Sequence, residues 1–187
     1  RGSTLSDVSF LFLLHFDQRG LLDAQAMSNE AVRAASAPAG SFLVCSTGRI
    51  GELLPMDRVV SGIHECARTL GNAPSDGERA ALAILTSDTR PKCCLANWEM
   101  EGLELTLGGF AKGAGMIEPN MATLLAFLLT DVKIKQGLLQ EILAGAVEKS
   151  FNRITIDGDM STNDTVLLLA NGTSGKLISE KTPRALE

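Results

Sequence analysis

The feature that most constrains the fold is the alternation of helical and extended patterns along the chain. Residues 23–37 carry apolar side chains at helical spacing, and Pro38 stops that pattern. Residues 42–45 follow as a short, fully apolar strand. Residues 57–70 again place apolar side chains on one helical face, with Asp57 positioned to cap the start. This order of elements predicts a mixed α/β fold.

The rest of the chain continues the alternation. Residues 95–100 and 103–107 flank Glu101 and Gly102, which predicts a hairpin. Residues 123–130 are densely apolar and 135–150 are an amphipathic helix. Further predicted elements are a buried strand at 8–14, a helix exit loop at 72–77, strands at 153–156 and 165–170, and a polar loop at 157–164. Since no repeat or linker interrupts them, we expect one mixed α/β unit over residues 1–187.

Composition excludes several classes of protein. With 17 Lys and Arg against 22 Asp and Glu, the net charge is -5, and the basic patch of a nucleic-acid binder is missing. The longest apolar run is far shorter than the roughly 20 residues of a membrane-spanning helix, and it lacks the basic flank of a secretory signal. The four cysteines form no Cys-x-x-Cys pair. We expect no nucleic-acid or membrane partner and a reducing, intracellular location.

The first segment that could carry chemistry is glycine-rich, at residues 108–115. It has neither phosphate-loop nor dinucleotide-binding spacing, so a tight turn between strands is the simpler interpretation. Eleven positions after Lys112, Thr123 follows Ala122 where a continuous apolar run begins. A threonine freed by cleavage gains its own α-amine, with a pKa of roughly 7.7 to 8.0, as a general base. Alternatively, the threonine only satisfies strand propensity.

Residues 112–127, KGAGMIEPNMATLLAF, resemble the autoprocessing motif of the ornithine acetyltransferases, also called glutamate N-acetyltransferases, which are cleaved between the Ala and the Thr. Other blocks follow in the family's order: STGRIG at 46–51, LPMD at 54–57, LTSDTRPK at 85–92, SFNRITIDGD at 150–159 and STNDT at 161–165. The similarity covers residues 21–175. The family has a longer region before residue 23 and a further part beyond 175 with a catalytic glutamate, so the resemblance implies a shortened chain.

The resemblance implies a role for six residues. Thr123 would be the nucleophile and, after cleavage of Ala122-Thr123, a new amino terminus. Thr47 and Gly48 would form an oxyanion hole. Thr86 and Lys112, together with Thr123, would bind substrate. Residues 1–122 and 123–187 would then correspond to an alpha chain and the start of a beta chain.

The resemblance also implies a four-layer α/β/β/α sandwich and a double displacement in which Thr123 takes acetyl from N-acetylornithine and passes it to glutamate. It implies no dissociable cofactor, with acetyl-CoA as a further donor in a bifunctional member. The expected assembly is alpha/beta heterodimers in a larger oligomer, in the cytoplasm or in the mitochondrial matrix of a eukaryote. The residues leave open an amidase or aminopeptidase of similar fold and an inactive fragment.

Two other kinds of site do not fit the residues. The 157–164 loop has its glycine in the wrong place for an EF-hand, and Leu168 stands where that motif needs Glu. We therefore expect no metal, and the loop's Asp and Asn side chains are predicted to bond their own turn. His15 and His64 have no spaced Asp and Ser partners, so a Ser-His-Asp triad is not predicted.

Overall fold

The computed structural model describes residues 18–47, 52–100, 102–115, 117, 124–159, 161 and 163–179. Contacts within the chain divide it into two compact units, Arg1–Ala80 and Ala81–Glu187. The sequence predicts a different boundary, between Ala122 and Thr123, and that boundary stays a prediction. The strand predicted at 8–14 lies outside the described residues.

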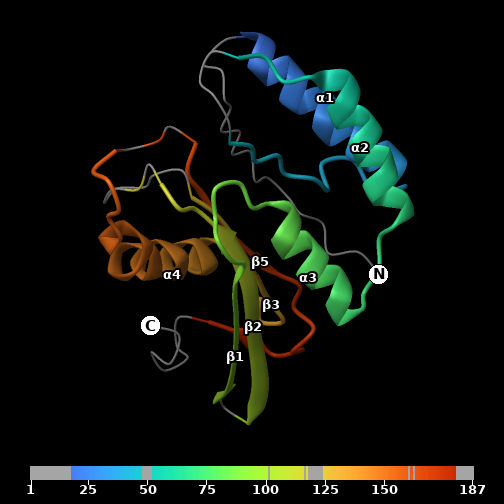
Figure 1. Cartoon of the computed structure of the whole chain (residues 1–187). Coiled ribbons are helices and arrows are strands. Elements are labelled where there is room, and N and C mark those ends of the chain that lie inside the picture. Colours follow the sequence, from blue (N-terminus) through green and yellow to red (C-terminus); the bar gives the residue numbers. More distant parts are fainter. Residues whose placement is uncertain are drawn as a thin grey trace. The chain divides into compact units, whose positions relative to one another are not determined.

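The first unit contains the helices α1 (Gln18–Ala34) and α2 (Met56–Arg68), which lie side by side (Figure 1). Both helices were predicted by apolar periodicity and are confirmed. Asp57 does not cap α2, because the residue before the helix is Pro55 and no side chain caps it. Asp57 lies instead in the first turn, where its charge favours the helix dipole.

The strand predicted at residues 42–45 is wrong. These residues are assigned to neither strand nor helix. The carbonyl oxygen of Phe42 accepts a hydrogen bond from the Ser28 hydroxyl at 3.0 Å. Among the described residues of the first unit no strand is available as a neighbour, so this apolar run has no ladder of backbone hydrogen bonds to join.

Helix α3 (Pro74–Ala83) begins where the sequence predicted a loop at 72–77. Proline suits the first position of a helix, because the N–H it lacks would have no partner there. Asp76 accepts the backbone N–H of Ala73 at 2.9 Å, which is half of a capping box, and it also pairs with Arg79. These two contacts lower the pKa of Asp76. Local capping therefore turns a segment with loop composition into a helix.

A four-stranded sheet forms the centre of the second unit (Figure 1). Its order is β1 (Lys92–Met100), β2 (Leu103–Lys112), β3 (Leu125–Thr130) and β5 (Thr165–Ala170). β2 is antiparallel to both β1 and β3, whereas β5 is parallel to β3. The predicted hairpin is confirmed, since Met100 pairs with Leu103 and Gly102 takes a φ of 76° in the turn. The strand predicted at 165–170 is also confirmed, and the densely apolar run that ends at Thr130 forms β3.

The glycine-rich segment is not a loop up to Lys112, because β2 continues through it. The surroundings of Gly109 show why β2 has a glycine at this position. A Cβ at this position would lie 2.6 Å from the carbonyl oxygen of Phe127 and from Leu128 Cδ2. Glycine therefore allows β3 to approach β2 closely, and the sequence alone could not distinguish this role from a turn.

Helix α4 (Gln136–Lys149) confirms the predicted amphipathic helix and lies in the connection between the parallel strands β3 and β5. The strand predicted at 153–156 is wrong: Phe151–Arg153 form a 3-10 helix, and an irregular segment follows. Among the described residues, the one backbone bond from this segment to another joins the Ile156 N–H to the Ile117 carbonyl at 2.7 Å. A ladder of such bonds is needed for a strand.

A small parallel pair, β4 (Lys133–Ile134) with β6 (Leu177–Ile178), completes the described elements of the second unit. One hydrophobic core cluster of this unit contains Met100, Leu105, Val132 and Ile178. The mixed α/β class is therefore confirmed, while the four-layer sandwich implied by the resemblance stays a prediction.

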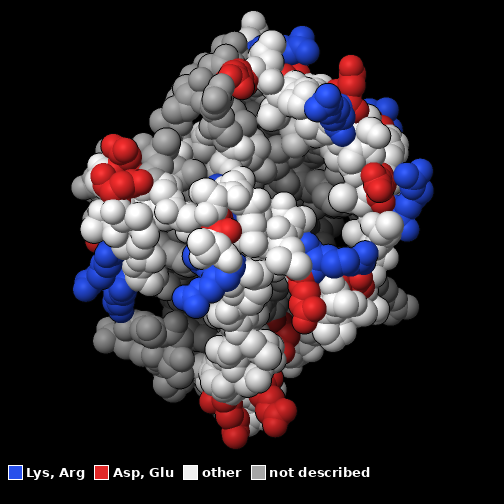
Figure 2. Space-filling view, viewed as in Figure 1, with Lys and Arg blue, Asp and Glu red and all other residues white. Residues whose placement is uncertain are grey.

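Acidic side chains gather at the turn end of the β1–β2 hairpin (Figure 2). Glu99 and Glu104 are direct partners across the two strands, and both are exposed. Like charges in this arrangement destabilise a strand pair. Within the described part of the chain, none of the helices combines the length and the apolar character needed to span a bilayer.

Candidate active site at one edge of the sheet

The strand directions bring four chain segments to one edge of the sheet. β2 ends at Lys112, and β1, which runs the other way, begins beside it with Lys92 opposite Ala111. β3 also begins at this edge, with Leu125 opposite Lys112. Because β5 is parallel to β3, it begins here too, with Thr165 opposite Leu125. Polar residues that flank these strand ends are therefore neighbours in space.

Lys112 is the buried cation of this edge, with 2% of its surface exposed. Burial lowers its pKa, because the charged ammonium loses water. The carboxylates of Asp88 and Asp164 act in the opposite direction and attract the charge. A lysine in this setting is held by carboxylates on two sides, one before β1 and one before β5.

Asp164 is a buried carboxyl group directly before β5, with 5% of its surface exposed. Its Oδ1 accepts the backbone N–H of Leu124 at 2.5 Å. Its Oδ2 is buried and has no hydrogen-bond partner among the described residues. Burial raises the pKa of Asp164 to about 6, although the Leu124 N–H and the charge of Lys112 both favour ionisation. This carboxyl group is therefore poised to change protonation near neutral pH.

Asp88 connects the segment before β1 to the end of β2. Its Oδ1 accepts the Gly113 N–H at 2.9 Å and contacts the Lys92 ammonium group. Burial alone would raise the pKa of Asp88, but the hydrogen bonds from Lys92, Gly113 and the Thr86 backbone lower it overall. Asp88 thus stays ionised and joins Lys92, at the start of β1, to the residue that follows Lys112.

The 157–164 loop bonds its own turn, as predicted, and also reaches another segment. The Asp159 N–H donates to Asp157 at 3.4 Å, and the Asn163 N–H donates to the Ser161 hydroxyl at 3.2 Å. Asp157 Oδ1 also accepts the Ile117 N–H at 2.9 Å. The aspartates at its two ends, Asp157 and Asp164, therefore both hold residues of the segment before β3.

The structure brings together two of the residues assigned by resemblance. Thr86 and Lys112 both belong to the second unit, where Asp88, two residues after Thr86, bonds Gly113, the residue after Lys112. Thr47 is half-buried in the first unit. Gly48, Ala122 and Thr123 lie outside the described residues, so their roles stay predictions. Leu124, the next residue after the predicted nucleophile, is described and is bonded to Asp164.

Sequence reasoning did not assign a role to Asp88 or Asp164. The sequence feature that could have pointed to Asp88 and Asp164 is their position inside the LTSDTRPK and STNDT blocks, which carry the family resemblance. Their partners could not be read from the sequence, because the bonds to Gly113 and Leu124 span 25 and 40 positions.

A cavity of about 320 Å³ lies beside the same edge. Its wall includes Ala111 and Ala126, which face each other across β2 and β3. Side chains alternate between the faces of a sheet, so Lys112 is directed to the opposite face. The other lining residues are mostly apolar and include Phe151, Ile154 and Ile156. Lys92, Gly113 and Leu124, which are bonded to Asp88 and Asp164, also line the cavity, so it borders the charged cluster of the candidate site.

Comparisons with known proteins agree with the blocks found in the sequence. The model of the ArgJ family matches residues 15–187. The arginine biosynthesis bifunctional protein ArgJ of Symbiobacterium thermophilum is 48% identical over 158 residues, which are 84% of this chain and 39% of that protein. The protein of the same name from Listeria monocytogenes is 47% identical over 154 residues, which are 82% of this chain and 38% of that protein.

A mitochondrial ArgJ protein from Meyerozyma guilliermondii is 46% identical over 158 residues, covering 84% of this chain and 36% of that protein. The crystal structure of ArgJ from Bacillus halodurans is 42% identical, with a TM-score of 0.49, over 56% of this chain and 54% of that one. The chain spans about two fifths of the length of the curated relatives it matches. Because the family model matches far more than half of its residues, the chain belongs to the ArgJ family.

Proposed function

We propose that this chain carries the nucleophile of an enzyme that transfers an acetyl group from N-acetylornithine to glutamate. Its curated relatives are named arginine biosynthesis bifunctional proteins. The observation that carries the proposal is the buried cluster of Lys112, Asp88 and Asp164 beside Leu124, one residue after Thr123. Because the chain spans about two fifths of those relatives, the activity is proposed for the protein of which these residues form the site.

The first step is cleavage of the Ala122-Thr123 bond. The Thr123 hydroxyl oxygen attacks the Ala122 carbonyl carbon, the C–N bond breaks, and the nitrogen takes up the hydroxyl proton. Water then hydrolyses the ester that forms, which leaves the Ala122 carboxylate, the Thr123 hydroxyl and a free α-amine. That amine is the general base of the later steps, because its ordinary pKa of roughly 7.7 to 8.0 lies near neutral pH.

Acetyl transfer follows as a double displacement. The Thr123 oxygen takes the acetyl group, and ornithine leaves with a protonated amine. The amine of glutamate then attacks the acetyl ester, which gives N-acetylglutamate and restores the hydroxyl. Thr47 and Gly48 donate hydrogen bonds to the developing oxyanion, and a donor of this kind is worth on the order of 3 kcal/mol.

The buried cluster fits substrates that are amino acids. Lys112 offers a point charge to a carboxylate, and its low exposure strengthens that attraction. Asp88 holds the N–H of Gly113, the residue directly after Lys112. In this proposal Thr86 and Lys112 bind the substrate, and Asp88 positions the strand end that carries Lys112.

Four further properties belong to the same proposal. Acetyl-CoA is an additional acetyl donor, and no resident cofactor or metal takes part. Residues 1–122 belong to one product of cleavage and residues 123–187 to the start of the other, and the two products associate as heterodimers in a larger oligomer. The location is the cytoplasm, or the mitochondrial matrix in a eukaryote, as the name of the Meyerozyma relative suggests.

Replacement of Thr123 tests this function. We expect Thr123→Ala to remain a single uncleaved chain by intact-mass analysis and to transfer no acetyl group from N-acetylornithine to glutamate. Thr123→Ser keeps a hydroxyl and is expected to cleave. Thr69→Ala is the matched control, since Thr69 is an exposed threonine that only bonds the end of its own helix.

The outcomes separate the candidate functions. Unimpaired acetyl transfer by Thr123→Ala would refute the proposal. Release of acetate without any need for glutamate would indicate an amidase of similar fold instead. An unaltered chain that neither cleaves nor transfers acetyl would indicate an inactive fragment.

A further inference from the structure

The 157–164 loop holds one segment of the chain at both of its ends. Asp157 Oδ1 accepts the N–H of Ile117 at 2.9 Å, and Asp164 Oδ1 accepts the N–H of Leu124 at 2.5 Å. Each bond joins residues 40 positions apart in the sequence. The 117–124 segment therefore has the same length as the loop, and the first and last residues of the two are bonded in order.

A backbone hydrogen bond reinforces each end. The Ile156 N–H donates to the Ile117 carbonyl at 2.7 Å, and the Thr165 N–H donates to the Leu124 carbonyl at 2.8 Å. Ile117 and Leu124 thus each have both of their backbone polar groups engaged by the loop and its neighbours. Ile117 is also 8% exposed, so its bonds are shielded from competing water.

This segment contains the predicted cleavage site. The Ala122-Thr123 bond lies between the two held residues, and Leu124 follows it directly. Attack of a hydroxyl on the neighbouring carbonyl needs close alignment, and a misplacement of about 1 Å can slow a reaction about 100-fold. The bonds to Asp157 and Asp164 reduce the backbone freedom of Ile117 and Leu124, the two described residues that flank this bond.

We propose that Asp157 and Asp164 are positioning residues that fix the two ends of the 117–124 segment for cleavage between Ala122 and Thr123. The inference rests on the proposed function, because it takes that cleavage as the reaction served. Neither aspartate touches the reacting atoms in this proposal. Both act through the backbone N–H groups of Ile117 and Leu124.

Single substitutions at each end test the proposal in the full chain. Asp157→Ala and Asp164→Ala remove the acceptors, and we expect cleavage after cell-free synthesis, followed by intact mass, to be at least about tenfold slower. Asp157→Asn and Asp164→Asn keep an acceptor oxygen, and we expect cleavage within about threefold of the unaltered chain. Amide hydrogen exchange adds a readout of the bond itself: each Ala variant should lose protection at its own partner, Ile117 or Leu124.

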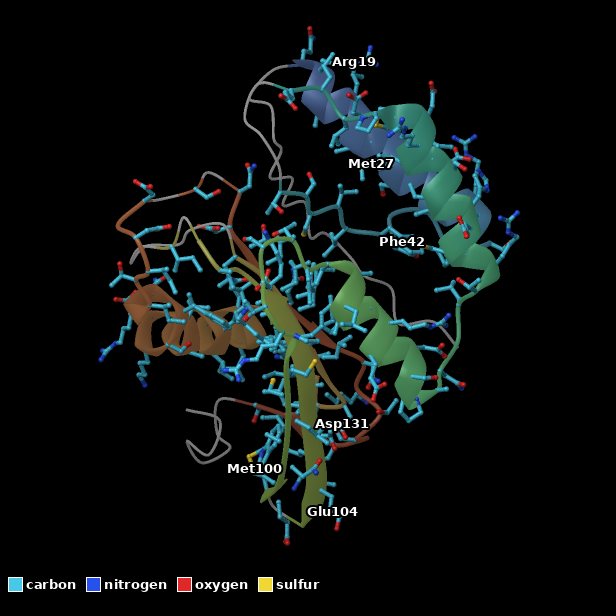
Figure 3. All side chains as sticks on the ribbon, in the orientation of Figure 1. Arg19, Met27, Phe42, Met100, Glu104 and Asp131 are labelled. Atoms are coloured by element: carbon cyan, nitrogen blue, oxygen red, sulfur yellow. The ribbon has the colours of Figure 1, made fainter. Side chains whose placement is uncertain are left out.

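Asp131→Ala is the matched control. Asp131 Oδ1 accepts the Thr106 N–H at 2.9 Å, so this variant also removes a carboxylate that bonds a backbone amide. Asp131 lies toward the turn end of the hairpin, with Met100 and Glu104 (Figure 3). We expect this variant to cleave at the rate of the unaltered chain.

Each outcome decides the proposal. Cleavage at the unaltered rate in both Ala variants overturns it, as does an equal slowing in Asp131→Ala, which would indicate general loss of structure. If the unaltered chain does not cleave, the proposed function fails, and hydrogen exchange then decides the inference. If the Ile117 and Leu124 amides are as protected from exchange in the Ala variants as in the unaltered chain, the proposed positioning role is overturned. If protection is lost in the Ala variants and restored in the Asn variants, the role is supported.

Discussion

Replacement of Asp164 by asparagine is expected to stabilise the chain at neutral pH and not at acid pH. The side chain is 5% exposed, and burial raises its pKa from 3.8 to about 6. Asparagine has nearly the same shape and keeps an oxygen that can accept the Leu124 N–H. The variant therefore removes the ionisation and preserves the hydrogen bond.

The magnitude follows from the two pKa values. An acid whose pKa is higher in the folded state holds its proton more tightly there, so the stability linked to that proton is complete below 3.8 and is lost as the pH rises through about 6. Above this window the buried carboxylate costs up to about 3 kcal/mol relative to a neutral group. Lys112 reduces the gain, because the variant also removes one of the carboxylates that attract its charge.

Urea unfolding of the unaltered chain and Asp164→Asn at several pH values measures this difference. We expect the variant to be more stable by about 1 to 3 kcal/mol at pH values above the window and to approach the unaltered chain below it. A difference that does not change with pH would refute the reasoning, because burial of the charge would then not be its cause. Lower stability of the variant at every pH would show that asparagine does not keep the bond to Leu124.

Two further predictions concern the strands of the sheet. Glu104→Lys replaces a like-charged pair with Glu99 by an opposite-charged one, so we expect the free energy of unfolding to rise by about 0.2 to 1 kcal/mol, and a gain that survives high salt would contradict the electrostatic cause. Gly109→Ala would place a Cβ 2.6 Å from the Phe127 carbonyl oxygen, so we expect a loss of about 1 to 3 kcal/mol in urea unfolding. At Gly108 the nearest atom to a Cβ is 3.7 Å away, so Gly108→Ala is the control, and equal losses in both variants would count against the close approach of β3.

The sequence alone predicted the elements whose signal is local. Helical periodicity identified α1, α2 and α4, and the alternation around Glu101 and Gly102 identified the hairpin. The apolar runs that became β3 and β5 were also recognised. The ordered blocks predicted the family, which the match over residues 15–187 confirms. Each of these signals lies within a few neighbouring residues, so no knowledge of distant contacts is needed.

Three errors have the opposite character, because each depends on a partner elsewhere in the chain, whereas the missed start of α3 has a local cause. Residues 42–45 and 153–156 have strand composition, but a strand exists only where another strand completes its hydrogen bonds. Residues 108–112 have loop composition, yet they extend β2 because β3 lies close enough to need glycine there. The composition of a segment does not show which distant part of the chain will lie beside it.

The candidate site shows the same contrast between what the sequence predicts and what the structure adds. Thr86 and Lys112 were assigned from the sequence by resemblance, and Thr123 remains assigned by that resemblance alone. Only the tertiary structure shows that Asp164 holds Leu124 and that Asp88 holds Gly113 at the end of β2. The physical reason is that folding buries Asp164 and Lys112 near each other, which raises the pKa of Asp164 and lowers that of Lys112, whereas the same residues in an extended chain would simply be solvated.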